Sequence, residues 1–443
     1  MQQTAVESAY LNTNPYIFSE SVLSADPSRV QYFMPNWDDT VDTMYATLQT
    51  AIGARRNQQG FAHQLYQRPY YDGILVSRAF VEENARRKQR ICVVKAHAYF
   101  RVPRAFTIMG DSGAFSYLNE PSPPYNTDDM LTYYTELDVD LGVSLDHLWF
   151  GGRNHQEQQQ RVELSLTNAA DFKAEHRRRQ LSWTPVGAIQ GWDVPSFVRS
   201  AQQVVKMGYD YVGLGGVIRM SNATLIAILE AVRQAIPADV RLHVFGVARP
   251  NIMGDYKRLR VTSADSAAPL RRAFMDVKGS YFTLEDHFAT FSIPRADIIS
   301  HTASTTTPAQ ALHVAEAHAL QAVQEWDNDQ LSVSATLDAL LTYQNLLRPT
   351  APSLKHLYRR TLQARPHRQC TCVLCQQLKA DILIMRDRNR NRRRAFHNTY
   401  VWYTLIQHIL DDKPVSEAWV KSLPRQLTLS LNDYPITTEQ DTP

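Results

Sequence analysis

Short apolar runs alternate with longer amphipathic stretches over most of the chain. Apolar runs that end in polar or glycine-rich residues predict strands, and stretches of about a dozen residues between them predict helices. We expect strands at 30–34, 74–76, 91–94, 106–109, 141–145, 186–189, 211–214, 242–245 and 261–265. We expect helices at 38–54, at 82–90, from 127, and at 156–179, 196–207 and 222–235.

This repeated alternation of strand and helix indicates parallel βαβ units and therefore the α/β class. About eight such units favour a closed (β/α)8 TIM barrel over a doubly wound sheet. The chain has no G-x-G-x-x-G opening a helix after the first strand, and no G-x-x-x-x-G-K-[ST]. These absences argue against dinucleotide binding and P-loop nucleotide binding.

The pattern divides the chain into four predicted parts. Residues 1–30 are polar and irregular, which predicts an N-terminal arm laid over the body of the protein. The catalytic barrel is expected over 31–350, with two helices at 309–348. A zinc-binding helical subdomain is expected at 355–411, and a short tail rich in Pro and Thr at 412–443.

The composition is that of an ordinary globular protein, with 44% hydrophobic and 21% charged residues in 443. Its net charge of +3 is too small to indicate a polyanionic partner by itself. The strongest basic run, 386–394, has six arginines and one acid, and a solvated helix face is its alternative interpretation. Without a signal peptide pattern or a long apolar window, the sequence predicts a cytoplasmic protein and no membrane partner.

Three of the four cysteines are clustered, which indicates a metal site and not a disulfide framework. Cys370, Cys372 and Cys375 bring three thiolates onto one tight turn, and Zn²⁺ binds four such ligands in a tetrahedron. The predicted fourth ligand is His397, with His367 and His408 as alternatives. Such a closed site would be structural.

Two acids at strand ends, Asp111 and Asp265, form the second candidate constellation. The carboxyl ends of parallel barrel strands meet at one mouth, so residues far apart in sequence can share a pocket. A pair of carboxylates is what cleavage of a glycosidic bond requires. The alternative is that both acids cap the following helices.

Polar and aromatic residues at the neighbouring strand ends suit a planar ligand with an amide-like edge, such as guanine. Two of them are phenylalanines that can stack on the faces of a base, although barrel core is the alternative for each. The candidate substrate-binding residues are Ser112, Phe115, Asp146, Gln190, Gly215, Gly216 and Phe245.

Several of these motifs occur in an order and spacing that resembles the tRNA-guanine transglycosylases, over about residues 90–405. They are Asp111-Ser112-Gly113-Ala114-Phe115, Ser144-Leu145-Asp146, Ile189-Gln190-Gly191, Leu214-Gly215-Gly216, Phe245-Gly246-Val247, Asp265 and the cysteine cluster with His397. The resemblance implies that Asp265 is the nucleophile on C1′ and that Asp111 is the general acid/base. It also implies a ping-pong base exchange that needs no redox cofactor or ATP, and Zn²⁺ as the structural metal.

The stretch 110–117 looks closest to the DNA 7-deazaguanine transglycosylase branch, which inserts preQ0 into DNA as part of a restriction–modification system. Ala114 replaces a usual glycine, and the segment after Asp265 departs from the wording of the tRNA enzymes. A target guanine in DNA would have to leave the base stack. Resemblance to this branch also implies a helper ATPase as a partner. The residues do not decide whether the chain forms a homodimer. The predicted phosphate contacts are Arg271, Arg272, Arg390, Arg392, Arg393 and Arg394.

Two other interpretations stay open at this point. A divergent tRNA-guanine transglycosylase, acting in queuosine-type or archaeosine-type tRNA modification, would share every catalytic residue and differ in the polymer bound. A non-catalytic scaffold subunit is the alternative from another class. The presence of both Asp111 and Asp265 argues against a scaffold.

Overall fold

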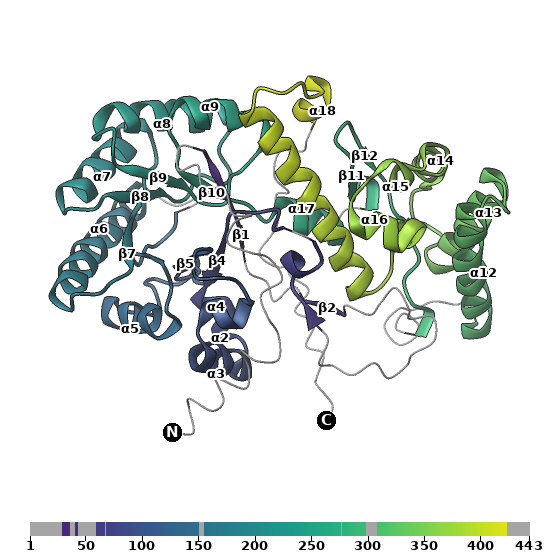
Figure 1. The fold of residues 1–443 in the computed structure, drawn as a ribbon, viewed down its shortest axis with the longest axis horizontal. Helices are drawn as coiled ribbons and strands as arrows, with labels where there is room; N and C mark the ends of the chain where they lie inside the picture. Colours follow the sequence, from purple (N-terminus) through teal and green to yellow (C-terminus); the bar gives the residue numbers. More distant parts are fainter. Residues whose placement is uncertain are drawn as a thin grey trace.

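A computed structural model describes residues 29–35, 40–42, 59–66, 68–149, 155–275, 277–297 and 308–422. Eight parallel strands close into a barrel in the order β1-β10-β9-β8-β7-β6-β5-β4 (Figure 1). The predicted (β/α)8 TIM barrel is therefore confirmed. The barrel strands are β1 (Gln31–Pro35), β4 (Gly73–Ser77), β5 (Thr107–Asp111), β6 (Leu141–Val143), β7 (Thr184–Ile189), β8 (Tyr211–Leu214), β9 (Arg241–Val244) and β10 (Ser263–Asp265).

Helices connect these strands and form the outer layer of the barrel (Figure 1). Local sequence sets where they begin. Asn126 and Asp129 form a reciprocal capping box at the start of α5, because each side chain accepts from the other's backbone N–H. The connecting helices are α2 (Arg78–Glu82), α3 (Ala85–Val94), α4 (Ala96–Phe100), α5 (Thr127–Leu137), α6 (His155–Arg178), α7 (Val194–Lys206), α8 (Asn222–Ala235), η5 (Pro250–Ile252) and α9 (Met253–Arg258), and α10 (Ala268–Met275) follows the last strand.

The barrel interior is a hydrophobic cluster separate from the main core between strands and helices. Side chains on a strand point alternately inward and outward, and inward residues of β1 and of β4 to β8 form this cluster. The same alternation carries the last inward positions of β5 and β10, Asp111 and Asp265, to the carboxyl-end mouth. The interior cluster consists of Phe33, Leu75, Met109, Leu141, Val143, Val186, Ala188 and Tyr211, with Phe245 packed against it.

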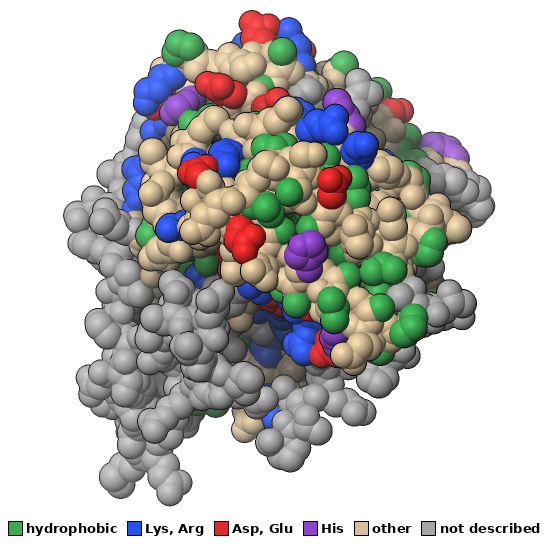
Figure 2. Space-filling model, turned by 90° about the vertical axis from the view of Figure 1, so that its right-hand side faces the viewer, with side chains coloured by type: hydrophobic (Ala, Val, Ile, Leu, Met, Phe, Trp, Pro, Cys, Tyr) green, Lys and Arg blue, Asp and Glu red, His purple; other side chains and the backbone are tan. Residues whose placement is uncertain are grey.

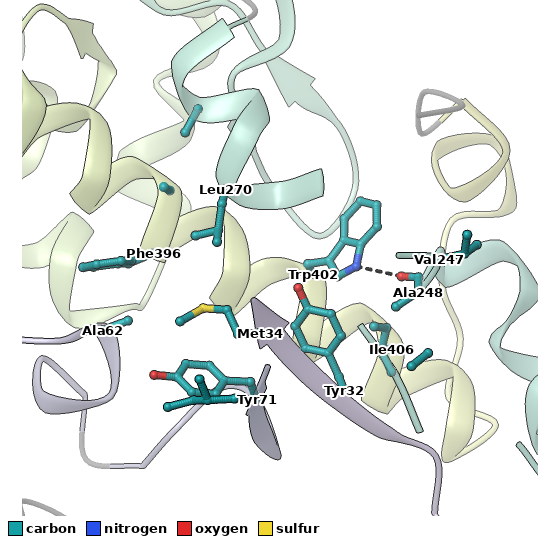
Figure 3. Close-up of a cluster of buried hydrophobic side chains, with 14 of the residues drawn as sticks. Tyr32, Met34, Ala62, Tyr71, Val247, Ala248, Leu270, Phe396, Trp402 and Ile406 are labelled. Atoms are coloured by element: carbon teal, nitrogen blue, oxygen red, sulfur yellow. Dashed lines mark hydrogen bonds between the residues drawn. The ribbon is translucent and has the colours of Figure 1, made fainter. Parts of the chain in front are cut away.

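The C-terminal helical region is fastened to the barrel by its longest helix, α17 (Arg388–Leu410), which packs against α9 and α10 (Figure 1). Figure 3 shows this contact, where Trp402 Nε1 donates to the carbonyl of Ala248 at 2.9 Å, near Tyr32 and Ile406. The other elements are η6 (Val277–Gly279), β11 (Tyr281–Phe282), β12 (His287–Phe288), β13 (Phe291–Ser292), α12 (Ala309–Asp327), α13 (Val333–Leu347), α14 (Lys355–Ala364), α15 (Pro366–Gln369), α16 (Val373–Leu378), η7 (Lys379–Leu383), β14 (Ile384–Met385) and α18 (Glu417–Ser422).

Two predicted elements are wrong where the structure describes them. The β-branched run at 91–94 is the last turn of α3, with Ile91 and Val94 buried at helical spacing, and not a strand. The helix predicted over 38–54 is interrupted by β2 (Val41–Asp42), which pairs with β3 (Gln59–Gly60); residues 43–54 lie outside the described residues.

The predicted domain limits stay predictions. Residues 1–28 of the predicted arm and 423–443 of the predicted tail lie outside the described residues. All eight barrel strands lie between Gln31 and Asp265, and α12 and α13 pack on η7 and α14. None of the helices in the described ranges is long and apolar enough to cross a membrane.

Candidate active site and metal centre

Asp265 is the last residue of β10 and is almost completely buried, with 4% of its surface exposed. Its Oδ1 atom accepts from the backbone N–H of Gly246 at 2.8 Å and lies 3.2 Å from His243 Nε2. Gly246 has a φ of 73°, a left-handed conformation that favours glycine. The loop after β9 is therefore shaped to hold one oxygen of this carboxylate.

Asp111 ends β5 and pairs in register with Ser77 of β4. The Ser77 side chain and the backbone of Gly113 hydrogen-bond to the carboxyl group, while Oδ1 is buried with no hydrogen-bond partner among the residues that the structure describes. Burial raises the pKa of Asp111 to about 7, and the nearby carboxylates of Asp265 and Asp146 add to this rise. A carboxyl group that titrates near neutrality can both donate and accept a proton, as a general acid/base must.

Asp146, Gln190, Gly215 and Gly216 lie together at the mouth. Gln190 Nε2 donates to Asp146 Oδ2 at 2.5 Å, and burial raises the pKa of Asp146 to about 6. The two glycines face this pair: a Cβ at Gly215 would lie 2.2 Å from Gln190 Nε2, and one at Gly216 2.8 Å from Gln190 Oε1. A side chain at either position would collide with the Gln190 amide, so glycine is what allows the backbone to lie this close to it.

Ser112 is buried, and its hydroxyl lies 2.6 Å from the hydroxyl of Tyr117. Tyr117 in turn donates to the backbone carbonyl of Asp146 at 3.1 Å. This chain connects the loop after β5 to the loop after β6, so Ser112 supports the position of Asp146. A direct contact between Ser112 and substrate stays a prediction.

The two phenylalanines differ in environment. Phe115 is 42% exposed, which is unusual for a large apolar side chain. Phe245 packs over the barrel interior beside Gly213, where a Cβ would lie 2.4 Å from its ring. Phe245 thus has core contacts as well as a place beside the mouth, while stacking on a base by either ring stays a prediction.

The predicted metal ligands Cys370, Cys372, Cys375 and His397 converge, with all four ligand atoms within 4.8 Å of one another. His397 Nδ1 lies 3.4 Å from the Sγ atoms of Cys372 and Cys375. Zinc bonds of about 2.0–2.3 Å in a tetrahedron require ligand separations of about 3.5–3.8 Å, so the group fits such an ion.

Neighbouring groups orient these metal ligands. His397 Nε2 lies 2.8 Å from the carbonyl oxygen of Phe282, which leaves Nδ1 facing the thiols. The Tyr281 hydroxyl lies 3.1 Å from Cys375 Sγ, and its ring stacks on His397. His367, one alternative fourth ligand, is held instead by Asp327 at 2.7 Å.

The predicted phosphate-binding surface at Arg392, Arg393 and Arg394 is wrong, because all three side chains are buried. Arg394 donates to the carbonyls of Ala273, Ile382 and Ile384 and so joins α17 to α10 and η7. On the face that carries α12 to α14, basic and acidic side chains are interspersed (Figure 2).

Two of the remaining predicted phosphate contacts, Arg271 and Arg390, are not tested by the structure. Arg390 is half-buried and pairs with Asp381 at 3.4 Å and Asp387 at 2.5 Å. On α10, directly after the strand of Asp265, Arg271 is half-buried and Arg272 is buried. Phosphate contacts by Arg271 and Arg390 stay predictions, whereas burial argues against Arg272 as it does against Arg392 to Arg394.

Ser77, Tyr117 and His243 were missed by the sequence analysis. Ser77 and His243 each occupy an inward position near the end of a strand, as Asp111 and Asp265 do. The same period-two argument would have found both. Tyr117 follows Asp111 by six residues in an irregular loop, where no periodicity points to it.

The fold and this mouth define a (β/α)8 barrel enzyme with paired carboxylates beside a group formed by an acid, an amide and two glycines. Residues 116–411 match the family model TGT, described as queuine tRNA-ribosyltransferase. The chain belongs to this family, and it is a guanine transglycosylase.

Two relatives differ in how much of the chain they match. A DNA-guanine transglycosylase of Salmonella montevideo is 33% identical over 411 residues, covering 86% of this chain and 98% of that protein. A tRNA-guanine(15) transglycosylase of Nanoarchaeum equitans is 25% identical over 163 residues, covering 36% of this chain and 38% of that protein.

Proposed function

We propose that this enzyme exchanges guanine in DNA for the 7-deazaguanine preQ0, as part of a DNA modification and restriction system. The observation that carries the choice of DNA is the extent of the similarity. The match to the DNA-guanine transglycosylase spans 98% of that protein, whereas the match to the archaeal tRNA enzyme spans 38%. The similarity to the DNA enzyme therefore extends over much more of the chain than the similarity to the archaeal tRNA enzyme.

The proposed reaction has two displacements at the same carbon. Asp265 attacks C1′ of the target nucleoside, the C1′–N9 bond breaks, and Asp111 gives its proton to the departing guanine. This leaves a covalent ester between the sugar and Asp265. The incoming 7-deazaguanine then loses its N9 proton to Asp111 and attacks C1′, which releases the Asp265 carboxylate. Two inversions retain the configuration.

The pKa of Asp111 supports its part in this cycle. A carboxyl group with a pKa of about 7 is protonated often enough to act as an acid and ionised often enough to act as a base at neutral pH. Formation of the ester removes the negative charge of Asp265, one of the groups that hold the Asp111 pKa up. Asp111 thereby becomes the stronger acid in the first step.

The group formed by Asp146, Gln190, Gly215 and Gly216 is the proposed binding site for the heterocycle. An ionised Asp146 accepts from the N–H groups of a guanine-like edge, and the Gln190 amide and the glycine backbone supply donors. Phe115 is proposed to stack on the extruded base, since its exposed ring lies on the loop that carries Asp111. Together these residues select a planar purine-like base.

We also propose that Cys370, Cys372, Cys375 and His397 hold a structural Zn²⁺. When bound, the ion cross-links the turn at the start of α16 to α17 and supplies no step of the exchange. Because α17 packs on α9 and α10, the same link supports the helix that follows the nucleophile.

The test is incorporation of labelled guanine by the purified protein into single-stranded DNA, duplex DNA and tRNA. The proposal expects label in DNA and none in tRNA, with Asp265→Asn abolishing incorporation while DNA binding remains. Label in tRNA alone would make the chain a tRNA enzyme. No label in any polymer would favour the scaffold interpretation, and label in single strands alone would support the proposed helper ATPase.

The identity of the incoming base needs a second measurement. Nucleosides from the DNA of cells that carry this gene with its genomic neighbours are compared by mass spectrometry with those of a deletion strain. A preQ0 deoxynucleoside that disappears on deletion supports the proposal. A different 7-deazaguanine in its place would correct the base while leaving the exchange reaction intact.

A further inference from the structure

A chain of buried polar groups runs through the barrel interior to Asp265. Tyr211 of β8 places its hydroxyl 2.6 Å from Ser263 Oγ on β10. Ser263 Oγ lies 2.6 Å from His243 Nδ1 on β9, and His243 Nε2 lies 3.2 Å from Asp265 Oδ1. Tyr211 is 2% exposed, and His243 and Ser263 are fully buried.

With Asp265 ionised and the His243 ring neutral, every hydrogen bond in this chain has one direction. An ionised Asp265 can only accept, so His243 Nε2 carries the proton and donates it to Oδ1. In a neutral ring Nδ1 then accepts from the Ser263 hydroxyl, and Ser263 accepts from the Tyr211 hydroxyl. Each donor is used once, and the imidazole is held as a single tautomer.

The surroundings of His243 keep its ring in place. Its centroid lies 4.4 Å from that of Phe245 and 5.9 Å from that of Phe33, so aromatic rings from β9 and β1 pack around the imidazole. The charged or titratable groups that the described contacts bring to it are Asp265 and, through Ser263, Tyr211. Such a ring is placed to orient its neighbour.

Both described donors to Asp265 meet at the same oxygen. The Gly246 N–H lies 2.8 Å from Oδ1, and His243 Nε2 approaches that same atom. With Oδ1 held from two sides, the carboxylate cannot rotate without losing both hydrogen bonds. Oδ2 is then the oxygen left to attack carbon.

We propose that His243 is a positioning residue that, together with the Gly246 N–H, anchors Asp265 through Oδ1 and leaves Oδ2 as the nucleophilic oxygen. This inference rests on the proposed role of Asp265 as the nucleophile. It assigns His243 to the two chemical steps, in which the Asp265–C1′ bond forms and breaks. Binding of DNA and of the free base does not involve it.

The experiment compares His243→Leu, which removes the donor, with His243→Gln, whose amide retains an N–H at similar reach. The rates of adduct formation and of guanine exchange are measured together with KM for DNA and guanine. We expect His243→Leu to lower kcat by about 10- to 100-fold, because small misplacement of a reacting group costs this much. Both KM values should stay within about twofold, and His243→Gln should recover most of kcat.

A matched control separates positioning from folding. His63 is an equally buried histidine, bonded to Tyr71 and to the Phe100 carbonyl, so His63→Leu should lower stability without the loss of kcat. Ser263→Ala is the second variant should His243→Leu not fold. It removes the donor to Nδ1 and should slow kcat by several-fold at unchanged KM.

Unchanged kcat in His243→Leu, or in Ser263→Ala where His243→Leu does not fold, would overturn the inference. So would a His243→Gln variant as slow as His243→Leu. Failure of the proposed function gives a different result, since Asp265→Asn would then still exchange guanine. An inactive Asp265→Asn beside a fully active His243→Leu rejects the positioning role alone.

Discussion

The mouth of the barrel and the Cys3His cluster both bury polar side chains that come from distant parts of the sequence. The two regions differ in how completely these side chains are hydrogen-bonded. Beside the cluster, Asn398 donates to the carbonyls of Pro269 and Ser280 and accepts from the N–H of Phe282. At the mouth, Asp111 Oδ1 is buried with no partner in the described part of the chain, and the carboxyl pKa is raised to about 7. Satisfied groups fix structure, whereas the unsatisfied acid is available for chemistry.

The largest expected effect comes from removing a metal ligand. Cys375→Ala should lose bound zinc and destabilise the C-terminal region by on the order of 5 kcal/mol or more, since structural zinc contributes directly to folding. Metal content per chain and thermal unfolding check this. Cys92→Ala is the matched control, because Cys92 is half-buried and outside the cluster. Equal metal content in both variants would contradict the assignment.

At the mouth of the barrel a substitution should increase stability and not lower it. Asp111→Asn should stabilise the protein above neutral pH. The folded carboxyl has a pKa of about 7 against an ordinary value of 3.8, so folding favours the protonated form. The stability that this carboxyl contributes should therefore be fully present below about pH 4 and be lost as the pH rises to about 7. The Asn variant lacks this loss, so its advantage above pH 7 is at most about 4 kcal/mol.

The same Asp111→Asn variant should be less active although it is more stable above neutral pH. Without its acid/base, Asp111→Asn should exchange guanine at least about 100-fold more slowly. Denaturation at pH 4 and pH 8 is measured beside the exchange rate. An Asn variant that is less stable than the wild type at pH 8 would show that the buried Asp111 carboxylate does not destabilise the folded protein.

Arg394→Met should destabilise the protein by about 3 kcal/mol, because it leaves buried carbonyls without a donor. Arg388 is exposed at the start of the same helix, and Arg388→Met should change stability by less than about 0.5 kcal/mol. Chemical denaturation measures both. Equal losses of stability in the two variants would mean that buried and exposed arginines of α17 contribute equally to stability.

The smallest expected effect is at Arg271, on the helix that follows the nucleophile. If this side chain contacts a DNA phosphate, Arg271→Ala should reduce the slope of log affinity against log salt by about 1. Stability should change by less than about 0.5 kcal/mol. DNA binding at several salt concentrations checks this, with Arg388→Ala as the control. An unchanged slope would remove Arg271 from the interface.

The barrel could be predicted from sequence because its signal is local and repeated. The helix predicted at 222–235 is α8 with the same bounds, since Ser221 caps it and an apolar face runs through it. The run at 91–94 was misjudged because β-branched residues fit both a strand and a buried helix end. The length of the helix and its surroundings, and not the residue types, determine that 91–94 is helical.

The candidate site was predictable where residues stand at strand ends, and less so where burial decides their role. Asp111, Asp146, Gln190 and Asp265 follow apolar runs that the pattern identifies. The arginines at 392–394 could not be placed, because charge alone does not say which side of a helix packs on a neighbour. His243 lies within an apolar run, and only its partners Asp265 and Ser263 distinguish it from an ordinary core histidine.

The covalent mechanism is tested most directly by mass spectrometry of the enzyme. The enzyme is incubated with single-stranded DNA in the absence of any incoming base, and the reaction is then quenched. We expect a covalent adduct whose proteolytic peptide carries the sugar on Asp265. Free base added before the quench should remove this adduct, and Asp111→Asn should slow its formation. An adduct on another residue, or full exchange without any adduct, would contradict the central claim.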